Sequence, residues 1–448
     1  MKPLKLSDIA SACGGKLHGD KDAFIKNIVT DSRQADKNSL FAAIKGEKVD
    51  GHDFIEQTKA KGAVCVLCEK APQAEINYIL VDSTLTALKK IAKYYRSLFS
   101  IPFIGITGSV GKTSTKEMIS SVLGEKFNVH KTAKNFNNEL GVPLTLFGLE
   151  EEHEIAVIEM GISDFSEMSR LADMVQPNIG VITNIGYCHL ENLKDLDGVR
   201  KAKTEMFDYI KKDGKIYLNG DDEKLFEIKD VNGITPCFYG INAHNEYYAK
   251  NIKDGLTSGV ECTLCNKDDQ IDVKIPALGV HMVQNALCAM AIAKDLGLSG
   301  EEIKHGIENF TNVGSRSRVI DTGYITIIDD CYNANPNSVK AGINTLKKFD
   351  TRTVAVIGDM KELGENEISM HAQIGKYIFD SKIDVLIAVG SLSKAMAEEF
   401  ENSIYFESTE QACGKINDYI KPQDTVLVKA SHSMHFEKLT DVLKELKG

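Results

Sequence analysis

The sequence predicts an α/β protein of three domains. Three observations support this: the length of the chain, the alternation of apolar strand-like runs with helical patterns, and a glycine-rich loop between a strand and a helix. The chain has 448 residues, enough for about three domains of about 150 residues each. We expect a small N-terminal α/β domain at 1–100, a central P-loop-type domain with a parallel sheet at 101–313, and a C-terminal Rossmann-like doubly wound domain at 314–448.

The first hundred residues alternate short apolar runs with a helical pattern. The runs lie at 63–67 and 78–81, and the helical pattern covers 86–98, so this part reads as a compact α/β unit that ends near Pro102. One C-x-x-C pair, Cys65 and Cys68, lies in a strand-like run, and so does Cys262 with Cys265 further on. Residues three apart in a strand point to opposite faces, so we expect neither pair to share a metal.

The central domain opens with a loop that reads GITGSVGKTST at 105–115. An apolar run at 101–106 precedes it and helical spacing at 116–123 follows. In this context glycines let the backbone wrap an anion, Lys112 can reach the outer phosphates, and the Thr113 hydroxyl can bind magnesium. The usual pattern has glycine at position 106, so a plain glycine turn is the alternative. The predicted nucleotide-binding residues are Gly108, Ser109, Val110, Gly111, Lys112, Thr113 and Ser114.

Further strands complete the two larger domains. Buried-strand patterns separated by helical stretches predict a parallel sheet with crossover helices in the central domain, and a doubly wound sheet in the third. A segment at 247–275 reads instead as β-hairpins. The predicted strands are 155–159, 179–184 and 215–219 in the central domain, and 325–328, 353–357, 385–389 and 425–429 in the third.

Two polar residues follow strand ends of the central sheet. Glu159 ends the run AVIEMG, at the edge of a parallel sheet where ligands bind, and its carboxylate can coordinate magnesium beside Thr113. His189 follows another strand end. The alternatives are a helix-capping carboxylate and a structural histidine.

Lys203 lies on the apolar side of a predicted helix, at the spacing it shares with Met206, Phe207 and Ile210. Desolvation there favours the neutral amine. A neutral amine can react with carbon dioxide to give a carbamate, an anion able to ligate magnesium. The alternative is a lysine at the edge of the core that extends its ammonium to water.

Two polar loops, IIDDCYNANPNS at 327–338 and VIGDMKELG at 356–364, follow strand ends of the third domain. They suggest a second ligand face opposite the phosphate loop, although either could be a solvated turn. The net charge of −11 argues against a nucleic-acid partner. We find no signal-like h-region and no apolar run of about 18 residues, so we expect a cytoplasmic enzyme without a membrane span. A reducing compartment would keep its ten cysteines as thiols. We also expect a monomer.

Taken together, several segments resemble the Mur ligase family. They are TDSRQ (30–34), FAAIKGEKVDGHDFI (41–55), GITGSVGKTSTKEM (105–118), NFNNELGVPLTL (135–146), VIEMG (157–161), HLENL (189–193), KAKTEMF (201–207), and the loops DDCYNANPNS and GDMKELG. The resemblance spans all three domains. It implies an ADP-forming ligase that uses ATP and Mg²⁺ to activate the carboxylate of UDP-N-acetylmuramoyl-tripeptide as an acyl phosphate. The amine of D-alanyl-D-alanine then attacks, as a step of peptidoglycan precursor synthesis.

The same resemblance assigns roles to residues. It implies catalytic Lys112, Glu159, His189 and Lys203, with magnesium on Thr113, Glu159, His189 and a carbamylated Lys203. It implies nucleotide contacts from Asn285, Asp330 and a phosphate-contacting arginine, for which Arg316 is preferred to Arg318. The uridine diphosphate end is assigned to an N-terminal set, Ser32, Arg33, Asp50, Gly51 and His52, and the incoming peptide to Asn333 and Asn335.

Three positions depart from the family pattern: Lys134 stands where glycine is usual, Met282 where asparagine is usual, and His432 where arginine is expected. A sister ligase or a folylpolyglutamate-synthase-like ligase is the nearest alternative function. A nucleotide-hydrolysing switch or a binding module is a more distant one. The sequence leaves open whether the tripeptide ends in lysine or meso-diaminopimelate.

Overall fold

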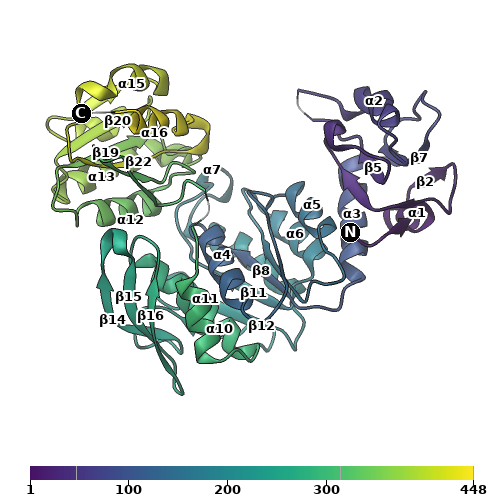
Figure 1. The fold of residues 1–448 in the computed structure, drawn as a ribbon, viewed down its shortest axis with the longest axis horizontal. Coiled ribbons are helices and arrows are strands. Elements are labelled where there is room, and N and C mark those ends of the chain that lie inside the picture. Colours follow the sequence, from purple (N-terminus) through teal and green to yellow (C-terminus); the bar gives the residue numbers. More distant parts are fainter. Residues whose placement is uncertain (47, 313, 447–448) are drawn as a thin grey trace.

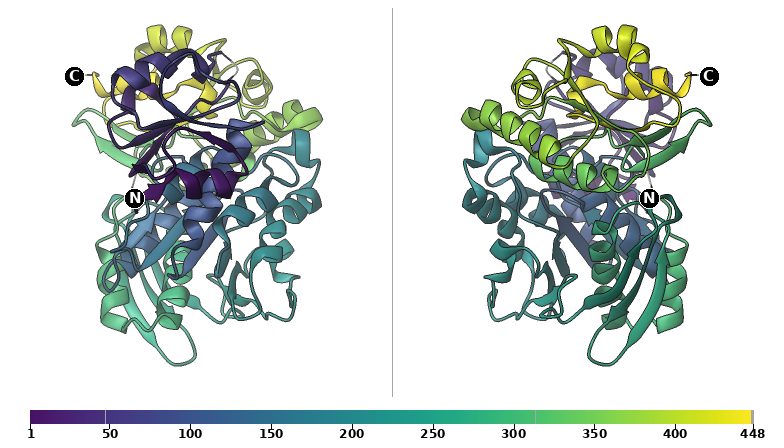
Figure 2. Two further views of the ribbon diagram at one scale, coloured as in Figure 1. Left: turned by 90° about the vertical axis from the view of Figure 1, so that its right-hand side faces the viewer. Right: turned by 90° about the vertical axis from the view of Figure 1, so that its left-hand side faces the viewer.

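The chain folds into three α/β domains that form a U, with the central domain at its base (Figure 1). The computed structural model describes residues 1–46, 48–312 and 314–446. Both outer domains lie on the same side of the central one (Figure 2). The predicted three-domain α/β architecture is confirmed. The domain limits stay predictions, and the proposed junction at Val313 and the chain end at Gly448 lie outside the described residues.

The main sheet of the N-terminal domain has five strands in the order β2-β7-β6-β5-β4, and of these only β2 is antiparallel to its neighbour, while β1 and β3 form a separate antiparallel pair. Alternation along β6 sends Cys65 and Cys68 into cores on opposite faces. The strands are β1 (Leu4–Lys5), β2 (Lys16–His18), β3 (Phe24–Ile25), β4 (Asn27–Val29), β5 (Ser39–Ala42), β6 (Cys65–Cys68) and β7 (Asn77–Leu80), and the helices are α1 (Leu6–Cys13), α2 (Ile55–Ala60) and α3 (Thr84–Ser97).

The central domain has a six-stranded, fully parallel sheet of order β13-β12-β11-β8-β10-β9. Since β8 pairs with both β10 and β11, the carboxyl ends of these three strands meet at one edge. The strands are β8 (Phe103–Thr107), β9 (Val129–Lys131), β10 (Ile155–Glu159), β11 (Ile179–Ile182), β12 (Lys215–Asn219) and β13 (Cys237–Tyr239), and the helices are α4 (Lys112–Leu123), α5 (Gly141–Phe147), α6 (Glu167–Val175), α7 (Leu190–Leu193), α8 (Leu196–Thr204) and α9 (Glu223–Phe226).

Both faces of this sheet are buried, as its uninterrupted apolar strands require. Along β10, Ala156 and Ile158 join the core that contains α5, α6 and the N-terminal α3, whereas Ile155 and Val157 join the core under α4. An antiparallel sheet packs into this second core, which confirms the predicted hairpins. Its strands are β14 (Tyr248–Asp254), β15 (Val260–Cys265) and β16 (Gln270–Ile275), followed by α10 (His281–Asp295) and α11 (Gly300–Glu308).

The third domain is a six-stranded sheet of order β17-β18-β22-β19-β20-β21, parallel except at the β17 edge. Separate cores on its two faces make it doubly wound, as predicted. The strands are β17 (Arg318–Asp321), β18 (Thr326–Asp329), β19 (Thr353–Gly358), β20 (Val385–Val389), β21 (Ile404–Phe406) and β22 (Thr425–Lys429), and the helices are α12 (Pro336–Leu346), α13 (Glu367–Asp380), α14 (Lys394–Glu398), α15 (Thr409–Lys415) and α16 (Glu437–Lys444).

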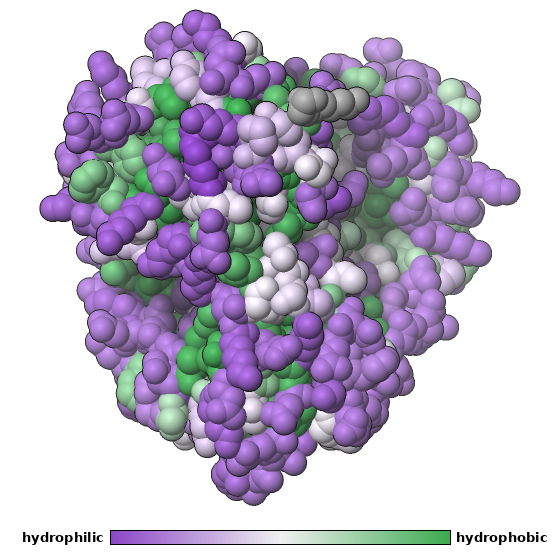
Figure 3. Space-filling view, turned by 60° about the vertical axis from the view of Figure 1, so that its left-hand side comes forward, coloured by the Kyte–Doolittle hydropathy of each residue, from purple (hydrophilic) through white to green (hydrophobic). Residues whose placement is uncertain are grey.

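The face of the molecule drawn in Figure 3 is mostly hydrophilic. On the face in Figure 3, hydrophilic residues form most of the protruding surface, hydrophobic ones are recessed between them, and the molecule is hollowed between its lobes. Among the described residues no helix combines the length and the hydropathy that a membrane crossing needs.

Candidate functional site

The glycine-rich loop lies between β8 and α4 and is fixed against the end of β11. Gly108 has a φ of +150°, and a Cβ there would lie 1.9 Å from Thr183 Oγ1. The Thr183 hydroxyl donates to the Val110 carbonyl at 2.6 Å, and Asn184 Oδ1 accepts the Val110 N–H at 2.9 Å. Only glycine therefore fits at position 108 while the loop stays this close to the neighbouring strand.

Thr183 and Asn184 were missed as site residues, although they are the polar pair at the end of the predicted strand 179–184; the observed β11 ends before them, at Ile182. Loop residue Ser109 extends the same junction. Its hydroxyl donates to the Gly186 carbonyl at 3.1 Å and accepts the Gly186 N–H at 2.9 Å. The loop is thus held in shape by the segment that leads to His189 before any ligand is considered.

Lys112 opens α4 and turns back over the loop. Its ammonium donates to the Gly108 carbonyl at 2.8 Å. Burial lowers the pKa of Lys112, the Glu159 carboxylate raises it, and the Arg316 guanidinium of the third domain lowers it again. The amino end of α4 adds unpaired N–H groups and the positive end of its dipole. Cations and backbone donors from two domains therefore converge where the sequence predicts phosphate.

Glu159 is a buried carboxylate at the end of β10, with 1% of its surface exposed. It accepts hydrogen bonds from the Thr113 hydroxyl and from Asn137 Nδ2, both at 2.7 Å, and Lys116 Nζ lies 3.9 Å away. A buried charge is tolerated only when it is paired and hydrogen-bonded in this way. Asn137 and Lys116 are contacts that the strand-end argument could not find.

The Thr113 and Glu159 oxygens suit magnesium, which prefers hard oxygen ligands and usually takes one or two carboxylates together with phosphate and water. Within residues 1–46, 48–312 and 314–446, no group of three or more His, Cys, Asp or Glu forms a complete protein cage for a metal. The donor set therefore fits a magnesium ion that shares its coordination sphere with a bound polyphosphate.

Lys203 is fully inside the protein, with 1% of its surface exposed, which confirms its predicted place on the apolar helix face with Met206 and Phe207. Burial lowers the pKa of Lys203 to about 8, Cys188 opposes this shift and Lys112 adds to it. In the described part of the chain, its ammonium forms no hydrogen bond or ion pair. The expected energetic cost of a bare buried ammonium is thus present, while the carbamate stays a prediction.

His189 directly precedes α7 and follows Cys188, whose thiol lies 3.1 Å from the Ser109 hydroxyl. The His189 backbone is in the left-handed region, with a φ of +52°. Its Nδ1 lies 2.5 Å from a carboxylate oxygen of Glu362, in the third domain. Cys188, the residue before His189, thus contacts the phosphate loop, and the role of His189 and Lys203 as metal ligands stays a prediction.

The third domain presents a second polar face. Asp330 pairs with the buried Lys429 at 2.6 Å and accepts the Ser317 N–H at 3.0 Å. Arg316 stacks over the Tyr332 ring at 3.9 Å, whereas Arg318 is in β17 opposite Asp329. The Arg316 guanidinium also lowers the pKa of Lys112, and its preference over Arg318 for a phosphate contact stays a prediction.

Two further contacts join α10 and α12 to this region. Asn285 on α10 accepts a hydrogen bond from the hydroxyl of Thr115, the last residue of the loop segment 105–115, at 3.0 Å. Asn337, at the start of α12, lies so close to Gly186 that a Cβ on that glycine would be 2.6 Å from its Nδ2. Asn337 was not predicted, because nothing in its sequence context distinguishes it from the neighbouring asparagines.

Asn333 and Asn335 have local roles in this structure. Asn335 caps α12 by accepting the Ser338 N–H at 2.8 Å, and Asn333 Oδ1 accepts the Ala334 N–H at 2.9 Å. Their predicted contact with a peptide is not tested by these bonds. Both side chains are at the loop that also carries Asp330.

The predicted uridine-diphosphate set surrounds α2 in the N-terminal domain, apart from the phosphate loop (Figure 1). The Ser32 hydroxyl donates to Gln57 on α2 at 3.1 Å, and Arg33 pairs with Asp31 at 2.8 Å. Asp50 caps the turn that contains Gly51 by accepting the His52 N–H at 3.0 Å. The fold therefore divides the predicted residues into two groups in separate domains.

The three departures from the family pattern each have a visible consequence. Lys134 has a φ of +49°, the conformation in which glycine is favoured. The Met282 sulfur accepts from Asn285 Nδ2 at 3.3 Å, and the His432 ring packs edge-on to Tyr332 with centroids 5.6 Å apart. The Met282 and His432 departures therefore lie beside predicted ligand contacts, Asn285 directly and Arg316 through Tyr332.

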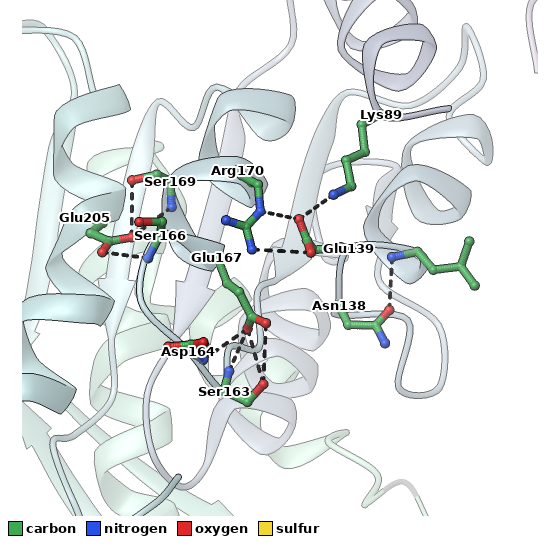
Figure 4. Close-up of polar contacts among 11 residues, drawn as sticks. Lys89, Asn138, Glu139, Ser163, Asp164, Ser166, Glu167, Ser169, Arg170 and Glu205 are labelled. Carbon is green, nitrogen blue, oxygen red and sulfur yellow. Dashed lines mark hydrogen bonds and ion pairs between the residues drawn. The ribbon is translucent and has the colours of Figure 1, made fainter. Parts of the chain in front are cut away.

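A charged network connects the N-terminal domain to the loop that holds Asn137 (Figure 4). Glu139, two residues along this loop, accepts from Arg170 Nε at 2.5 Å and from Lys89 of α3. Nearby, Glu205 accepts the Ser166 N–H at the start of α6 at 3.0 Å. Although burial raises it, the hydrogen bonds from Arg170 and Lys89 hold the pKa of Glu139 below its usual value.

Comparisons with known proteins add the following findings. Residues 106–293 match the family description "Mur ligase middle domain", 315–432 match "Mur ligase, glutamate ligase domain", and 24–96 match "Mur ligase family, catalytic domain". The chain is 36% identical over 434 residues to the UDP-N-acetylmuramoyl-tripeptide–D-alanyl-D-alanine ligase of Bacillus subtilis. The aligned region covers 94% of this chain and 93% of that protein.

Two solved structures resemble the whole fold. A crystal structure of MurF from Acinetobacter baumannii superimposes with a TM-score of 0.93 at 31% identity and covers 100% of both chains. MurF ligase from Thermotoga maritima, solved in complex with ADP, superimposes with a TM-score of 0.85 at 26% identity and covers 94% of this chain and 97% of that one.

We predict that Glu139→Gln lowers the first thermal unfolding midpoint at pH 7. The substitution removes the carboxylate charge that pairs with both Lys89 and Arg170. We expect the loss of these ion pairs to cost about 1 kcal/mol of stability, which lowers the unfolding midpoint of a domain the size of the central one by about 2–4 °C. Because the folded pKa of Glu139 is lowered, its contribution is present above the ordinary value of 4.5 and is lost as the pH falls through the folded value.

Scanning calorimetry of the two proteins from pH 7 to about pH 3 should therefore show the difference shrink. Glu401→Gln, at an exposed turn, is the charge-matched control and should leave the midpoint unchanged. A constant difference across this pH range would mean that the carboxylate charge of Glu139 is not what stabilises the junction.

Proposed function

The chain belongs to the Mur ligase family, and we propose that it joins D-alanyl-D-alanine to UDP-N-acetylmuramoyl-tripeptide with ATP, forming ADP and phosphate. The observation that carries this proposal is similarity along the whole chain to ligases of that name, N-terminal domain included. The phosphate loop with Glu159 buried beside Thr113 supplies the matching chemistry. A solved sister ligase and a folylpolyglutamate synthase share the fold but are only 15% and 16% identical to this chain.

The reaction needs an activated carboxylate, because a free carboxylate is a poor electrophile at neutral pH. Transfer of the γ-phosphoryl group to the tripeptide carboxylate breaks the bond to ADP and forms an acyl phosphate. The amine of D-alanyl-D-alanine then attacks the acyl carbon, phosphate leaves, and an amide remains. The loop N–H groups, the amino end of α4 and Lys112 hold and neutralise the phosphates, so catalysis rests on positioning and charge.

Magnesium, when bound, would supply the positive charge that lets two anions approach each other. Thr113 and Glu159 would hold one ion at the polyphosphate, and His189 with a carbamylated Lys203 would hold a second near the acyl phosphate. Support for the carbamate comes from the burial of Lys203 and its lack of any partner in the described chain. An ammonium there would repel both Lys112 and a metal, whereas a carbamate attracts them.

Substrate contacts follow the division seen in the fold. Asn285, Arg316 and Asp330 would contact the nucleotide at the junction of the second and third domains. The set around α2 would hold the uridine diphosphate end, and Asn333 with Asn335 would lie near the incoming peptide. We propose that the enzyme acts in the cytoplasm, where ATP and nucleotide-linked precursors are found, and that it is a monomer.

We predict that phosphate release requires ATP, the UDP-tripeptide and D-alanyl-D-alanine together. The reason is that the loop serves acyl-phosphate formation, and turnover needs the amine that consumes the intermediate. A phosphate-release assay with each component omitted tests this, and running it with the lysine and the meso-diaminopimelate tripeptides identifies the third residue. Comparable release from ATP alone would instead identify a nucleotide-hydrolysing switch.

We predict that Lys203→Ala lowers ligase activity by about 100-fold or more, since it removes a proposed metal ligand. Short carboxylic acids such as acetate should restore part of the activity by filling the vacated anion site. Lys203→Arg keeps the positive charge but cannot be carbamylated, so it should be as inactive as the alanine variant and should not respond to acetate.

Lys201→Ala is the matched control, because Lys201 is on the same helix but exposed, and it should retain activity and show no acetate effect. Steady-state rates with and without acetate give the readout. Near-full activity of Lys203→Arg would overturn the carbamate and leave Lys203 as a buried structural lysine.

A further inference from the structure

Three separate contacts join the segment at His189 to the third domain. The Leu190 N–H donates to the Glu362 carbonyl at 2.9 Å, and His189 Nδ1 lies 2.5 Å from Glu362 Oε2. Gly364 packs against the backbone of Glu191, where a Cβ would lie 3.3 Å from the Glu191 nitrogen. A backbone bond, a side-chain contact and a close glycine approach therefore all join the same two segments.

The Glu362 segment is anchored in its own domain. The Met360 N–H is accepted by Nε2 of the fully buried His371 at 2.9 Å. The neighbouring Asp359 carboxylate accepts the Ser393 N–H at 2.9 Å, and the Lys361 N–H reaches Ser431 at 2.9 Å. Because both flanks of Glu362 are held, its carboxylate is presented to the central domain by a rigid support rather than by a free loop.

Two non-glycine residues at this junction adopt positive φ values, His189 at +52° and Glu362 at +66°. Such conformations are unfavourable for residues with a Cβ and persist only when the surroundings determine them. Each residue is thus held in an unfavourable backbone conformation where the two side chains meet, which points to a requirement for this pairing.

The contact occupies one side of the His189 ring. Nδ1 is buried, and its close polar neighbour is Glu362 Oε2 at 2.5 Å, although the two atoms do not meet in hydrogen-bond geometry here; no hydrogen bond of Nε2 is seen within the described residues. A histidine that ligates a metal through one nitrogen commonly has its other nitrogen held by a carboxylate, which fixes the tautomer and the ring orientation. Glu362 is in the position of that carboxylate, but it belongs to a different domain from the histidine.

Building on the proposed function, we propose that Glu362 is a positioning residue for His189. Its carboxylate is placed to accept a hydrogen bond from Nδ1–H once the ring is aligned, which leaves Nε2 free as a metal ligand, so the metal site is complete only when the third domain is docked on the central one. Domain docking and metal binding are then coupled through a single carboxylate.

The test compares Mn²⁺ binding, followed by electron paramagnetic resonance in the presence of ADP, among four proteins: the unmodified protein, Glu362→Gly, Glu362→Gln and the control Glu365→Gln. Glycine adopts the positive φ of position 362 without strain, so Glu362→Gly removes the carboxylate and keeps the loop. Glu365 is exposed on the same segment, three positions away in the sequence. We expect Mn²⁺ affinity to fall about tenfold or more in Glu362→Gly, less in Glu362→Gln and not in Glu365→Gln.

Nitrogen-15 spectra of the histidine rings add a readout that a structural role would not change: the His189 signals should report the Nδ1–H tautomer in the unmodified protein and a mixture in Glu362→Gly. Unaltered Mn²⁺ affinity in Glu362→Gly, or a higher affinity, would overturn the inference, the latter because Glu362 would then compete with the metal. If the unmodified protein does not ligate its substrates, the proposed function is wrong. The Mn²⁺ and nitrogen-15 measurements do not require ligation, so they test the role of Glu362 separately.

Discussion

The buried carboxylate of Glu159 is the constraint around which the central domain is arranged. Its charge, with 1% of the residue exposed, must be matched by donors that come from different parts of the chain. The Thr113 hydroxyl comes from the start of α4 and Asn137 from the loop before α5, while Thr132, after β9, accepts the Glu159 backbone N–H at 2.9 Å. The carboxylate thus joins two neighbouring segments and the backbone of the same residue joins a third, and Asn137 connects this cluster to Glu139 and the N-terminal domain.

An acidic protein must bind polyanions with local rather than global charge. The net charge is −11, so attraction to ATP and to a nucleotide-linked substrate has to come from oriented backbone N–H groups and a few well-placed cations. Lys112 and Arg316 are such cations, whereas the buried Lys203 has no anionic partner among the described residues and is proposed to become an anion. A bound phosphate chain with its metal, or a carbamate, supplies the missing negative charge, so ligand binding relieves an imbalance present in the protein alone.

Sequence patterns predicted the architecture well where the physical signal was local. Strands 155–159, 215–219, 385–389 and 425–429 were predicted with the bounds that the structure shows, because buried parallel strands are uninterrupted apolar runs. The burial of Lys203 followed from helical spacing alone. The roles of the predicted site residues came from the resemblance, since neither spacing nor composition distinguishes a ligand from a cap, as Asn335 illustrates.

The missed contacts share one physical cause. Thr183, Asn337 and Glu362 act on partners that are distant in sequence, and their own neighbourhoods carry no periodicity that marks them. Glu362 looked like part of a solvated turn, and 56% of its side chain is indeed exposed. Only the packing of two domains shows that its carboxylate faces His189. Contacts of this kind depend on tertiary geometry, which a single sequence does not encode locally.

The central claim is that the phosphate loop transfers a phosphoryl group to a carboxylate instead of to water. The most direct measurement follows oxygen: the terminal carboxylate of the UDP-tripeptide is labelled with oxygen-18, and the phosphate released during ligation is analysed by mass spectrometry. The account predicts that each released phosphate carries one oxygen from the labelled carboxylate. Phosphate that contains no carboxylate oxygen, with its new oxygen derived from solvent, would contradict it.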